Sequence, residues 1–164
     1  MRRGLILGLL LALCPIPAQA SSCNWDTNPG WVQRENQKSG SSNWAANIPL
    51  RFSADFSRRK NAPRIEGFAS TTSATCGEKV GITTIGSKRF DLDIYRMGYY
   101  NNKGARLIRT LDSPKKITVD SSMVPGQYLL KLRSKNRAVS FIPLMITAKT
   151  ANDLTFISSV LTWQ

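Results

Sequence analysis

Apolar and polar residues alternate over several short stretches in the second half of the chain. The clearest is 90–97, where Phe90, Leu92 and Ile94 fall on one face, and two acidic residues and a tyrosine fall on the other. A two-residue period of this kind is typical of a β-strand with one buried face. The following residues, 98–104, are rich in glycine and asparagine, which tolerate positive φ. The pattern therefore predicts a strand that ends in a tight turn.

Further stretches with strand character alternate with turn residues on either side of this one. They are 65–72, 79–85, 106–111, 116–120, 127–133 and 138–148. About seven short strands without helical periodicity predict an all-β fold, an antiparallel β-sandwich of immunoglobulin-like size. The sandwich is expected to occupy residues 64–150. Pro143 predicts that part of the last strand lies at an edge or forms a bulge, because proline cannot donate to the strand ladder.

The first 20 residues have the composition of a secretory signal. Arg2 and Arg3 precede the apolar run Gly4–Cys14, and Ala18-Gln19-Ala20 forms a small-x-small cleavage site. The apolar run is shorter than the roughly 20 residues that a membrane-spanning helix needs. We therefore expect a cleaved signal peptide over 1–20 and an exported protein, periplasmic or extracellular. An uncleaved anchor is the alternative.

The mature chain keeps Cys23 and Cys76. Two cysteines in a small exported domain most simply form a disulfide. Closing a loop of about 54 residues would stabilise the fold by at most about 4 kcal/mol in the chain-entropy picture. The alternative is a nucleophilic Cys76, but the chain contains no histidine, which excludes Cys–His and Ser–His–Asp chemistry.

Residues 21–63 show little periodicity and are expected to form an irregular arm. Trp25, Trp31 and Trp44 lie within it. Tryptophans spread through a polar segment usually anchor it on a hydrophobic surface, and a carbohydrate-stacking platform would use the same residues. At the other end, residues 151–164 include the apolar run Leu154–Leu161. This run is expected either to open a further, truncated domain or to add an edge strand to the sandwich.

Without Arg2 and Arg3 the chain has 21 basic and 10 acidic residues, a net charge of +11. Such a surface attracts anions, although general solvation explains many basic proteins. Lys131 and Arg133 share a face of one predicted strand. Together with the cations of the following turn they would form a basic stripe along a sheet edge. In one role, the charges of the stripe would prevent the edge strand from pairing with another chain. In the other role, the stripe would be an anion-binding surface.

The turn after residue 97 carries the best candidate binding site. Aromatic and cationic side chains surround it: Tyr95, Arg96, Tyr99, Tyr100 and Arg106. In a structural role, the two arginines would bind the turn's carbonyl groups or the acidic residues of the strand. In a functional role, they would hold an anionic or sugar ligand by charge-assisted hydrogen bonds and stacking.

Three motifs carry a resemblance to a known family. The first is Glu35-Asn36-Gln37-Lys38 with Gly40 and Trp44, and the second is Ile65-Glu66-Gly67-Phe68-Ala69-Ser70 with Thr72-Ser73. The third is Ile94-Tyr95-Arg96 with Gly98, Tyr100, Gly104, Ala105 and Arg106. These motifs resemble the N-terminal region of the large (beta) subunit family of N,N-dimethylformamidase, over roughly residues 33–164. Asn101-Asn102 stands where that family has paired glycines, and Cys76 where it tends to have proline.

The resemblance implies an accessory sandwich, because the family's metal site and amide-hydrolysing residues belong to a large domain that follows. Thr162-Trp163-Gln164 resembles the opening of that domain, so none of those residues is carried over. We expect no cofactor and no metal site. Asp91 and Asp93 could bind a hard cation but are more simply solvated or paired with Arg89, Arg96 or Arg106.

Taken together, the sequence predicts an exported, non-catalytic binding or interaction module. One alternative is the non-catalytic part of an amide hydrolase completed by a separate chain. The other is a binder of an anionic glycan or envelope polymer. We expect no specific nucleic-acid partner, and no transmembrane segment once the signal is removed.

Overall fold

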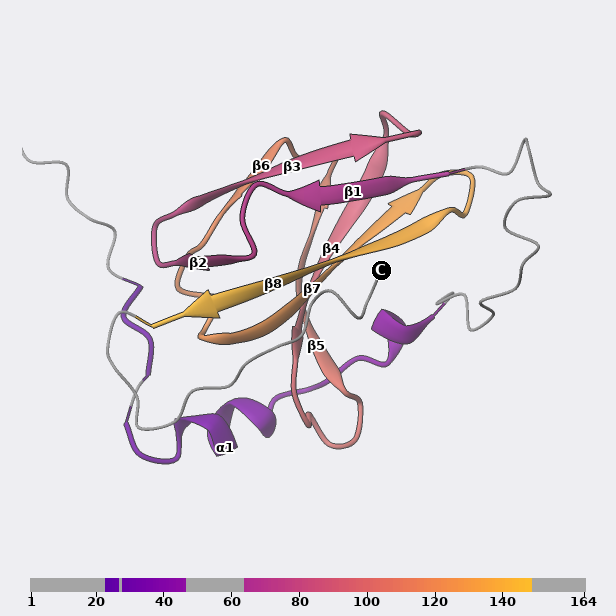
Figure 1. Cartoon of the computed structure of the whole chain (residues 1–164). Coiled ribbons are helices and arrows are strands. Elements are labelled where there is room, and N and C mark those ends of the chain that lie inside the picture. Colours follow the sequence, from indigo (N-terminus) through magenta and orange to yellow (C-terminus); the bar gives the residue numbers. More distant parts are fainter. Residues whose placement is uncertain (1–22, 27, 47–63, 149–164) are drawn as a thin grey trace, which may run out of the picture.

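The computed structural model describes residues 23–26, 28–46 and 64–148. Two sheets face each other in a sandwich (Figure 1). The smaller sheet contains β1 (Glu66–Ala69), β3 (Lys79–Ile85) and β6 (Lys116–Thr118), in that order. The larger sheet has the order β2 (Ser73–Thr75), β8 (Val139–Thr147), β7 (Gly126–Ser134), β4 (Phe90–Met97) and β5 (Ala105–Asp112). The predicted all-β sandwich is confirmed. The predicted signal peptide at 1–20 and the predicted strand or further domain at 151–164 lie outside the described residues.

All pairings are antiparallel except that of β2 with β8, which is parallel. The predicted strand 65–72 is wrong in one respect, because the chain changes sheet there. Ser70 still binds Gly81 through its backbone N–H, and its side chain accepts a hydrogen bond from the Gly81 N–H. The chain then turns, and β2 joins the far edge of the five-stranded sheet.

The hydrophobic core lies between the two sheets and consists of alternate residues along the strands, including the Phe90, Leu92 and Ile94 face predicted from the sequence. The inward positions on four strands are Val80 and Ile82, Leu92 and Ile94, Leu130 and Leu132, and Ile142 and Leu144. Gly67 on β1 brings the sheets close together, since a Cβ there would lie 2.4 Å from Leu132 Cδ1. Close packing of this kind leaves no room for a side chain at that position.

The predicted edge character of Pro143 agrees with the topology. Pro143 lies opposite Leu129 of β7, whereas β2 pairs with β8 only from Met145 to Thr147. Among the described strands, Pro143 therefore has a ladder partner on one side alone. A missing N–H is tolerated at such a position.

The described part of the N-terminal arm contains a short helix, α1 (Trp31–Asn36), and a 3-10 turn, η1 (Asn43–Ala45). It runs along the side of the five-stranded sheet that faces away from the core (Figure 1). Ser41 N–H donates to the Ala105 carbonyl at 2.8 Å, and Trp44 Nε1–H donates to the Lys103 carbonyl at 2.8 Å. The outward face of this sheet is therefore partly covered by the chain's own N-terminal region.

Candidate functional site

The turn between β4 and β5 is built from unusual backbone conformations. Asn101, Asn102 and Gly104 have φ of 55°, 63° and 79°, as glycine and asparagine permit. Tyr100 also has positive φ, 40°, and its side chain is fully buried. A Cβ on Gly104 would lie 2.9 Å from the Trp44 indole, so the arm packs directly on this turn.

Arg96, one of the two candidate arginines, is buried and binds within the molecule. Its Nη2 and Nε donate to the Pro125 carbonyl at 2.8 and 3.3 Å, and its Nη1 donates to the Tyr100 hydroxyl at 2.8 Å. Its guanidinium also lies 5.8 Å from the centre of the Trp31 ring, within the range of a cation–π contact. Arg96 thus connects β4, the loop before β7 and α1.

Glu35 of α1 supplies the negative charge at this corner, and only 3% of it is exposed. Its Oε1 accepts hydrogen bonds from Arg106 Nε and the Tyr100 hydroxyl, both at 2.9 Å, and lies 2.6 Å from Arg106 Nη2. Its Oε2 accepts from Lys38 Nζ at 2.6 Å. We call Glu35, Tyr100, Arg96 and Arg106 the corner cluster.

Burial is the largest single influence on Glu35 and acts to raise its pKa. Hydrogen bonds from Lys38, Tyr100 and Arg106 together outweigh it, so the pKa of the carboxyl lies below its ordinary value. For Arg106, burial acts to lower the pKa, but the bonds to Glu35 and Tyr100 raise it overall. Both groups are therefore held in their charged forms. The anion that Arg106 binds is thus part of the same chain.

Asn36 adds a second link between the arm and the turn. Its Oδ1 accepts hydrogen bonds from the N–H groups of Tyr99 and Tyr100, at 2.8 and 3.4 Å. Tyr99 is 60% exposed, whereas Tyr95 is buried on β4. Burial raises the pKa of Tyr95. Of the five residues predicted at this corner, Tyr99 is thus the one with a largely free side chain.

The prediction that Lys131 and Arg133 lie along a sheet edge is wrong. They lie on β7, which has β8 on one side and β4 on the other. Lys131 is 2% exposed, and its Nζ donates to the carbonyl groups of Asn43 and Ala46, both at 2.6 Å. Burial lowers its pKa. Lys131 therefore holds the arm against the sheet and is not available to an external anion.

Arg133 is neutralised by acids of the neighbouring strand. Its Nε lies 2.6 Å from Asp93 Oδ2, and its Nη2 lies 3.3 Å from Asp91 Oδ2. The expected arginine partners Arg89, Arg96 and Arg106 are therefore wrong, because the neighbouring strand β7 places Arg133 beside the two aspartates. The hydrogen bond to Asp93 is the main reason that the pKa of Arg133 is raised.

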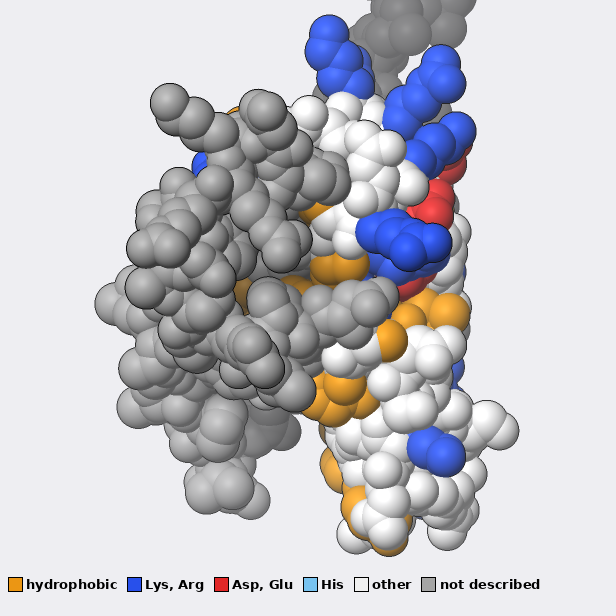
Figure 2. Space-filling model, turned by 90° about the vertical axis from the view of Figure 1, so that its right-hand side faces the viewer, with side chains coloured by type: hydrophobic (Ala, Val, Ile, Leu, Met, Phe, Trp, Pro, Cys, Tyr) orange, Lys and Arg blue, Asp and Glu red, His pale blue; other side chains and the backbone are white. Residues whose placement is uncertain are grey.

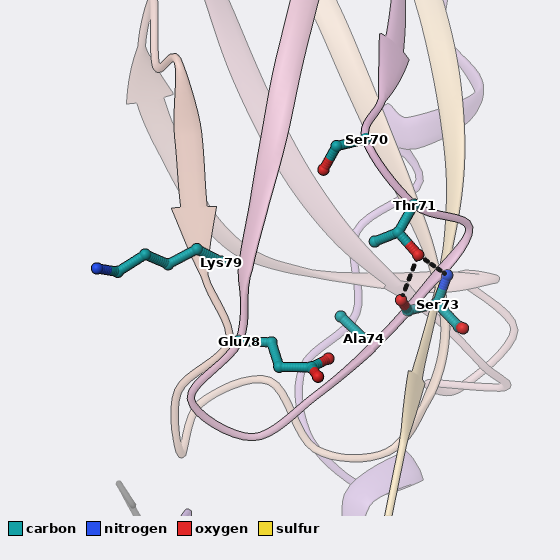
Figure 3. Close-up of a pocket in the computed structure, with 6 residues that line it drawn as sticks. All are labelled: Ser70, Thr71, Ser73, Ala74, Glu78 and Lys79. Carbon is teal, nitrogen blue, oxygen red and sulfur yellow. Dashed lines mark hydrogen bonds between the residues drawn. The ribbon is translucent and has the colours of Figure 1, made fainter. Parts of the chain in front are cut away.

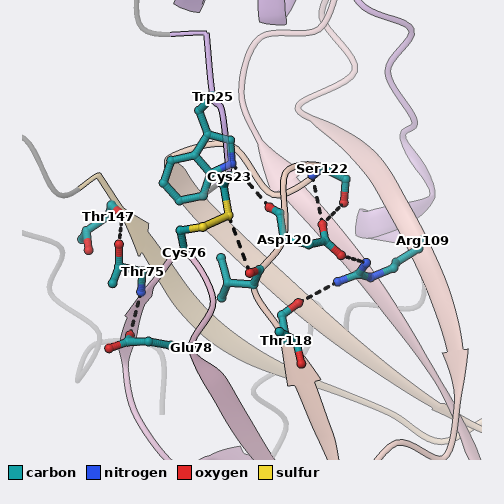
Figure 4. The surroundings of a disulfide bond; sticks show 11 residues. Cys23, Trp25, Thr75, Cys76, Glu78, Arg109, Thr118, Asp120, Ser122 and Thr147 are labelled. Carbon is teal, nitrogen blue, oxygen red and sulfur yellow. Dashed lines mark hydrogen bonds and ion pairs between the residues drawn. A yellow bond between two sulfur atoms is a disulfide. The ribbon is translucent and has the colours of Figure 1, made fainter. Parts of the chain in front are cut away.

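The disulfide predicted between Cys23 and Cys76 is present, with an S–S distance of 2.03 Å (Figure 4). It fastens the start of the arm to the turn between β2 and β3. Beside it, Trp25 Nε1–H donates to the Asp120 carbonyl at 3.4 Å. The Asp120 carboxylate binds Ser122 and Arg109, which hold its pKa below the ordinary value against the opposing effect of burial.

A shallow depression between β1, β2 and β3 is lined mainly by polar groups (Figure 3). Ser70 Oγ accepts from the Gly81 N–H, Thr71 Oγ1 donates to the Ser73 carbonyl, and Glu78 Oε2 accepts from the Thr75 N–H. Lys79 extends away from these groups. The hydroxyl and carboxylate groups here thus already bind the backbone that forms the depression.

Five exposed cations without an acidic partner among the described residues lie at the opposite end of the sandwich from α1 and the disulfide. We call this surface the turn end; its cations are Arg64, Lys88, Arg89, Lys135 and Arg137. All five are exposed, and none has an acidic partner among the described residues. Figure 2, which looks onto this end, shows Lys and Arg side chains over the upper part of the described surface.

Strand pairing explains why these cations lie together. Phe90 at the start of β4 pairs with Ser134 at the end of β7, so the turns containing Arg89 and Lys135 are neighbours. A Cβ on Gly86 would lie 2.4 Å from the Arg64 carbonyl oxygen, so Arg64 lies against the same β3–β4 turn. These cations come from segments that are far apart in the sequence, and the order of strands in the sheets brings them to one end.

Within the described ranges, no group of three or more Cys, Asp or Glu side chains is placed to hold a metal ion. No helix in the described part of the chain is long and apolar enough to cross a membrane. Comparison with known proteins gave no matching family model and no matching curated protein.

Proposed function

We propose that this protein is an exported, non-catalytic β-sandwich module that acts by binding another macromolecule. One observation carries the proposal. The carboxylate, hydroxyl and guanidinium groups at the corner, which could bind a ligand or take part in a reaction, already bind one another. Glu35, Tyr100 and Arg106 form a closed set of hydrogen bonds between α1 and the β4–β5 turn. Groups arranged in this way hold the arm in place, which leaves binding to the exposed surface of the sandwich.

The resemblance to the N-terminal region of N,N-dimethylformamidase-like proteins supports an accessory role. The residues that carry it come from motifs far apart in the sequence, yet Glu35 of the first meets Tyr100 and Arg106 of the third. Because residues that carry the resemblance meet in a buried structural contact, the resemblance supports a common structural element more than a common reaction centre. The module would then accompany an amide-hydrolysing domain, on the same protein or on a separate chain.

An activity assay on purified protein, free of other chains, tests the proposal. We expect no hydrolysis of simple amides such as formamide derivatives, with or without added divalent metal. The Glu35→Gln variant should unfold more easily than the wild type and behave identically in that assay. Amide turnover by the purified wild type would overturn the proposal, and loss of that turnover in folded Glu35→Gln would show that Glu35 takes part in the reaction.

Export is tested by the mass of the protein recovered outside the cytoplasm. The chain should begin near Ser21 and should be two hydrogens lighter than the reduced chain, since Cys23 and Cys76 are joined. Protein that retains residues 1–20, or that remains in the cytoplasm, would contradict the expected secretory signal.

A further inference from the structure

We propose that the turn end binds a linear polyanion, specifically an acidic polysaccharide. The inference rests on the proposed function as a binding module and assigns it a surface and a class of partner. The surface differs from the one that the sequence suggested, because Lys131 and Arg96 are buried and Arg106 is bound to Glu35 of the arm.

Charge distribution is the first support. The described cations of the corner and of β7 have partners inside the chain, whereas Arg64, Lys88, Arg89, Lys135 and Arg137 have no described acid beside them. Glu66 and Asp112 are the nearby acids that no described cation pairs with. Positive charge at the turn end therefore exceeds negative charge, and it is free to attract anions.

The backbone of Arg137 is the second support. Arg137 N–H donates to the Ser134 carbonyl and Ser134 N–H donates to the Ala138 carbonyl, which closes a tight β7–β8 turn. Arg137 has φ of 65°, a conformation that favours glycine and costs other residues energy. Strained positions of this kind often mark functional sites. An arginine here puts a charge at the tip of the turn at some cost in stability.

The arrangement fits an extended ligand better than a small one. The five cations come from three separate segments: the start of β1, the β3–β4 turn and the β7–β8 turn. A single phosphate or sulfate is held by donors that converge on one point, as in a backbone nest or an arginine fork. Cations spread over neighbouring turns instead match repeated charges along a polymer, each contact adding to the affinity as counterions are released.

Among anionic polymers, an acidic polysaccharide is favoured over nucleic acid. Proteins that bind single strands without sequence preference stack bases on exposed aromatic side chains. At the turn end Phe90 is buried and Phe141 is partly buried beneath Lys131, at 5.8 Å from its Nζ. Phe68 of β1, 55% exposed, is the single exposed aromatic ring near the described part of this surface, so the surface lacks the row of rings on which successive bases would stack.

The test measures binding to heparin, a soluble sulfated polysaccharide, over a series of NaCl concentrations. The variant Arg89→Gln/Lys135→Gln removes two charges from neighbouring turns. The matched control Lys79→Gln/Lys103→Gln removes two equally exposed and unpaired charges that lie away from the turn end. We expect at least tenfold weaker binding for the first variant and less than twofold for the control. The slope of log K against log salt should fall by about one to two units only in the first variant, as expected for two lost contacts.

Competition by phosphate, and direct binding of vesicles and of DNA, distinguish a polysaccharide from other anionic ligands. Inorganic phosphate at a few millimolar should not displace heparin, and anionic phospholipid vesicles or single-stranded DNA should bind more weakly than heparin. Equal loss of affinity in both variants would overturn the proposal, as would displacement by phosphate or preferential binding of vesicles or DNA. If the wild type binds no polyanion, this assignment fails while a protein partner for the module stays testable by copurification.

Discussion

At the scale of single residues, Glu35 is the most consequential side chain that we describe. It is a buried carboxylate on a helix of six residues, and it binds a cation and a hydroxyl from the β4–β5 turn. A helix this short is not stable alone, so α1 depends on such contacts. Removing one partner of a buried ion pair leaves the other charge uncompensated.

We therefore predict that Glu35→Gln lowers the free energy of unfolding by about 2 kcal/mol, less than for a fully buried pair because Arg106 and Lys38 are partly exposed. Tyr100→Phe, which keeps the ring and loses one hydroxyl, should cost about 1 kcal/mol. Urea unfolding followed by tryptophan fluorescence measures both. An unchanged midpoint for Glu35→Gln would show that the corner cluster does not stabilise the arm.

The lowered pKa of Glu35 predicts how this contribution depends on pH. Because the folded-state pKa lies below the ordinary value of 4.5, the stabilisation is complete above that value and is lost as pH falls through the folded-state pKa. The difference in unfolding free energy between wild type and Glu35→Gln should thus be constant from pH 7 to about 5. It should shrink at lower pH, measured by urea unfolding at each pH. A difference that grows on acidification would contradict the lowered pKa.

Sequence reasoning selected Tyr95, Arg96, Tyr100 and Arg106 but not the group that binds them. Alternation and turn composition show where these side chains gather. They cannot show that a carboxylate 71 positions before Arg106 occupies the space, because Glu35 lies in a segment without a clear period. The motif that contains Glu35 marked the segment as notable without indicating its contact.

At the scale of elements, strand positions follow closely from the sequence, and strand order does not. The predicted bounds of β3 and β4 match the structure, because a buried inner face imposes strict alternation. Alternation says nothing about which strand is the neighbour of which. For that reason the position of β7 inside the sheet, and the change of sheet between β1 and β2, could not be predicted.

The β7–β8 turn provides a prediction at this scale. Arg137→Gly should raise the free energy of unfolding by about 1 kcal/mol, since glycine adopts φ of 65° without steric cost. Asn136→Gly, at a neighbouring position without positive φ, should be neutral or slightly destabilising. Thermal unfolding of the two variants measures the contrast. Destabilisation by Arg137→Gly would mean that the arginine side chain stabilises the turn by more than its backbone costs.

The same Arg137→Gly variant should bind heparin more weakly than the wild type while being more stable. Opposite changes in stability and binding are expected when a strained residue is kept for its function. Binding that is unchanged would remove Arg137 from the proposed surface and leave the other four cations to account for it.

At the scale of the whole molecule, three of the attachments that fasten the arm are the disulfide, the corner cluster and Lys131. The disulfide joins residues separated by 53 positions. We predict that Cys23→Ser/Cys76→Ser lowers the free energy of unfolding by up to about 4 kcal/mol, the chain-entropy value for a loop of this size. Urea unfolding of the variant, beside wild type with and without reductant, measures it. Equal stability of all three samples would show that the other two attachments suffice.

The contact between Lys131 and the arm also determines when, during folding, the arm can take its final position. Asn43 leaves the ribosome early, yet the ammonium group that its carbonyl binds lies 88 residues further along the chain. Contacts at such long range form slowly, and nearly the whole sandwich must emerge before this one is possible. The arm, although it is synthesised before the sandwich, is thus among the last parts of the chain to reach its final position. Until then the outward face of β4 and β7, which carries Asp93, Lys131 and Arg133, is not covered by the arm.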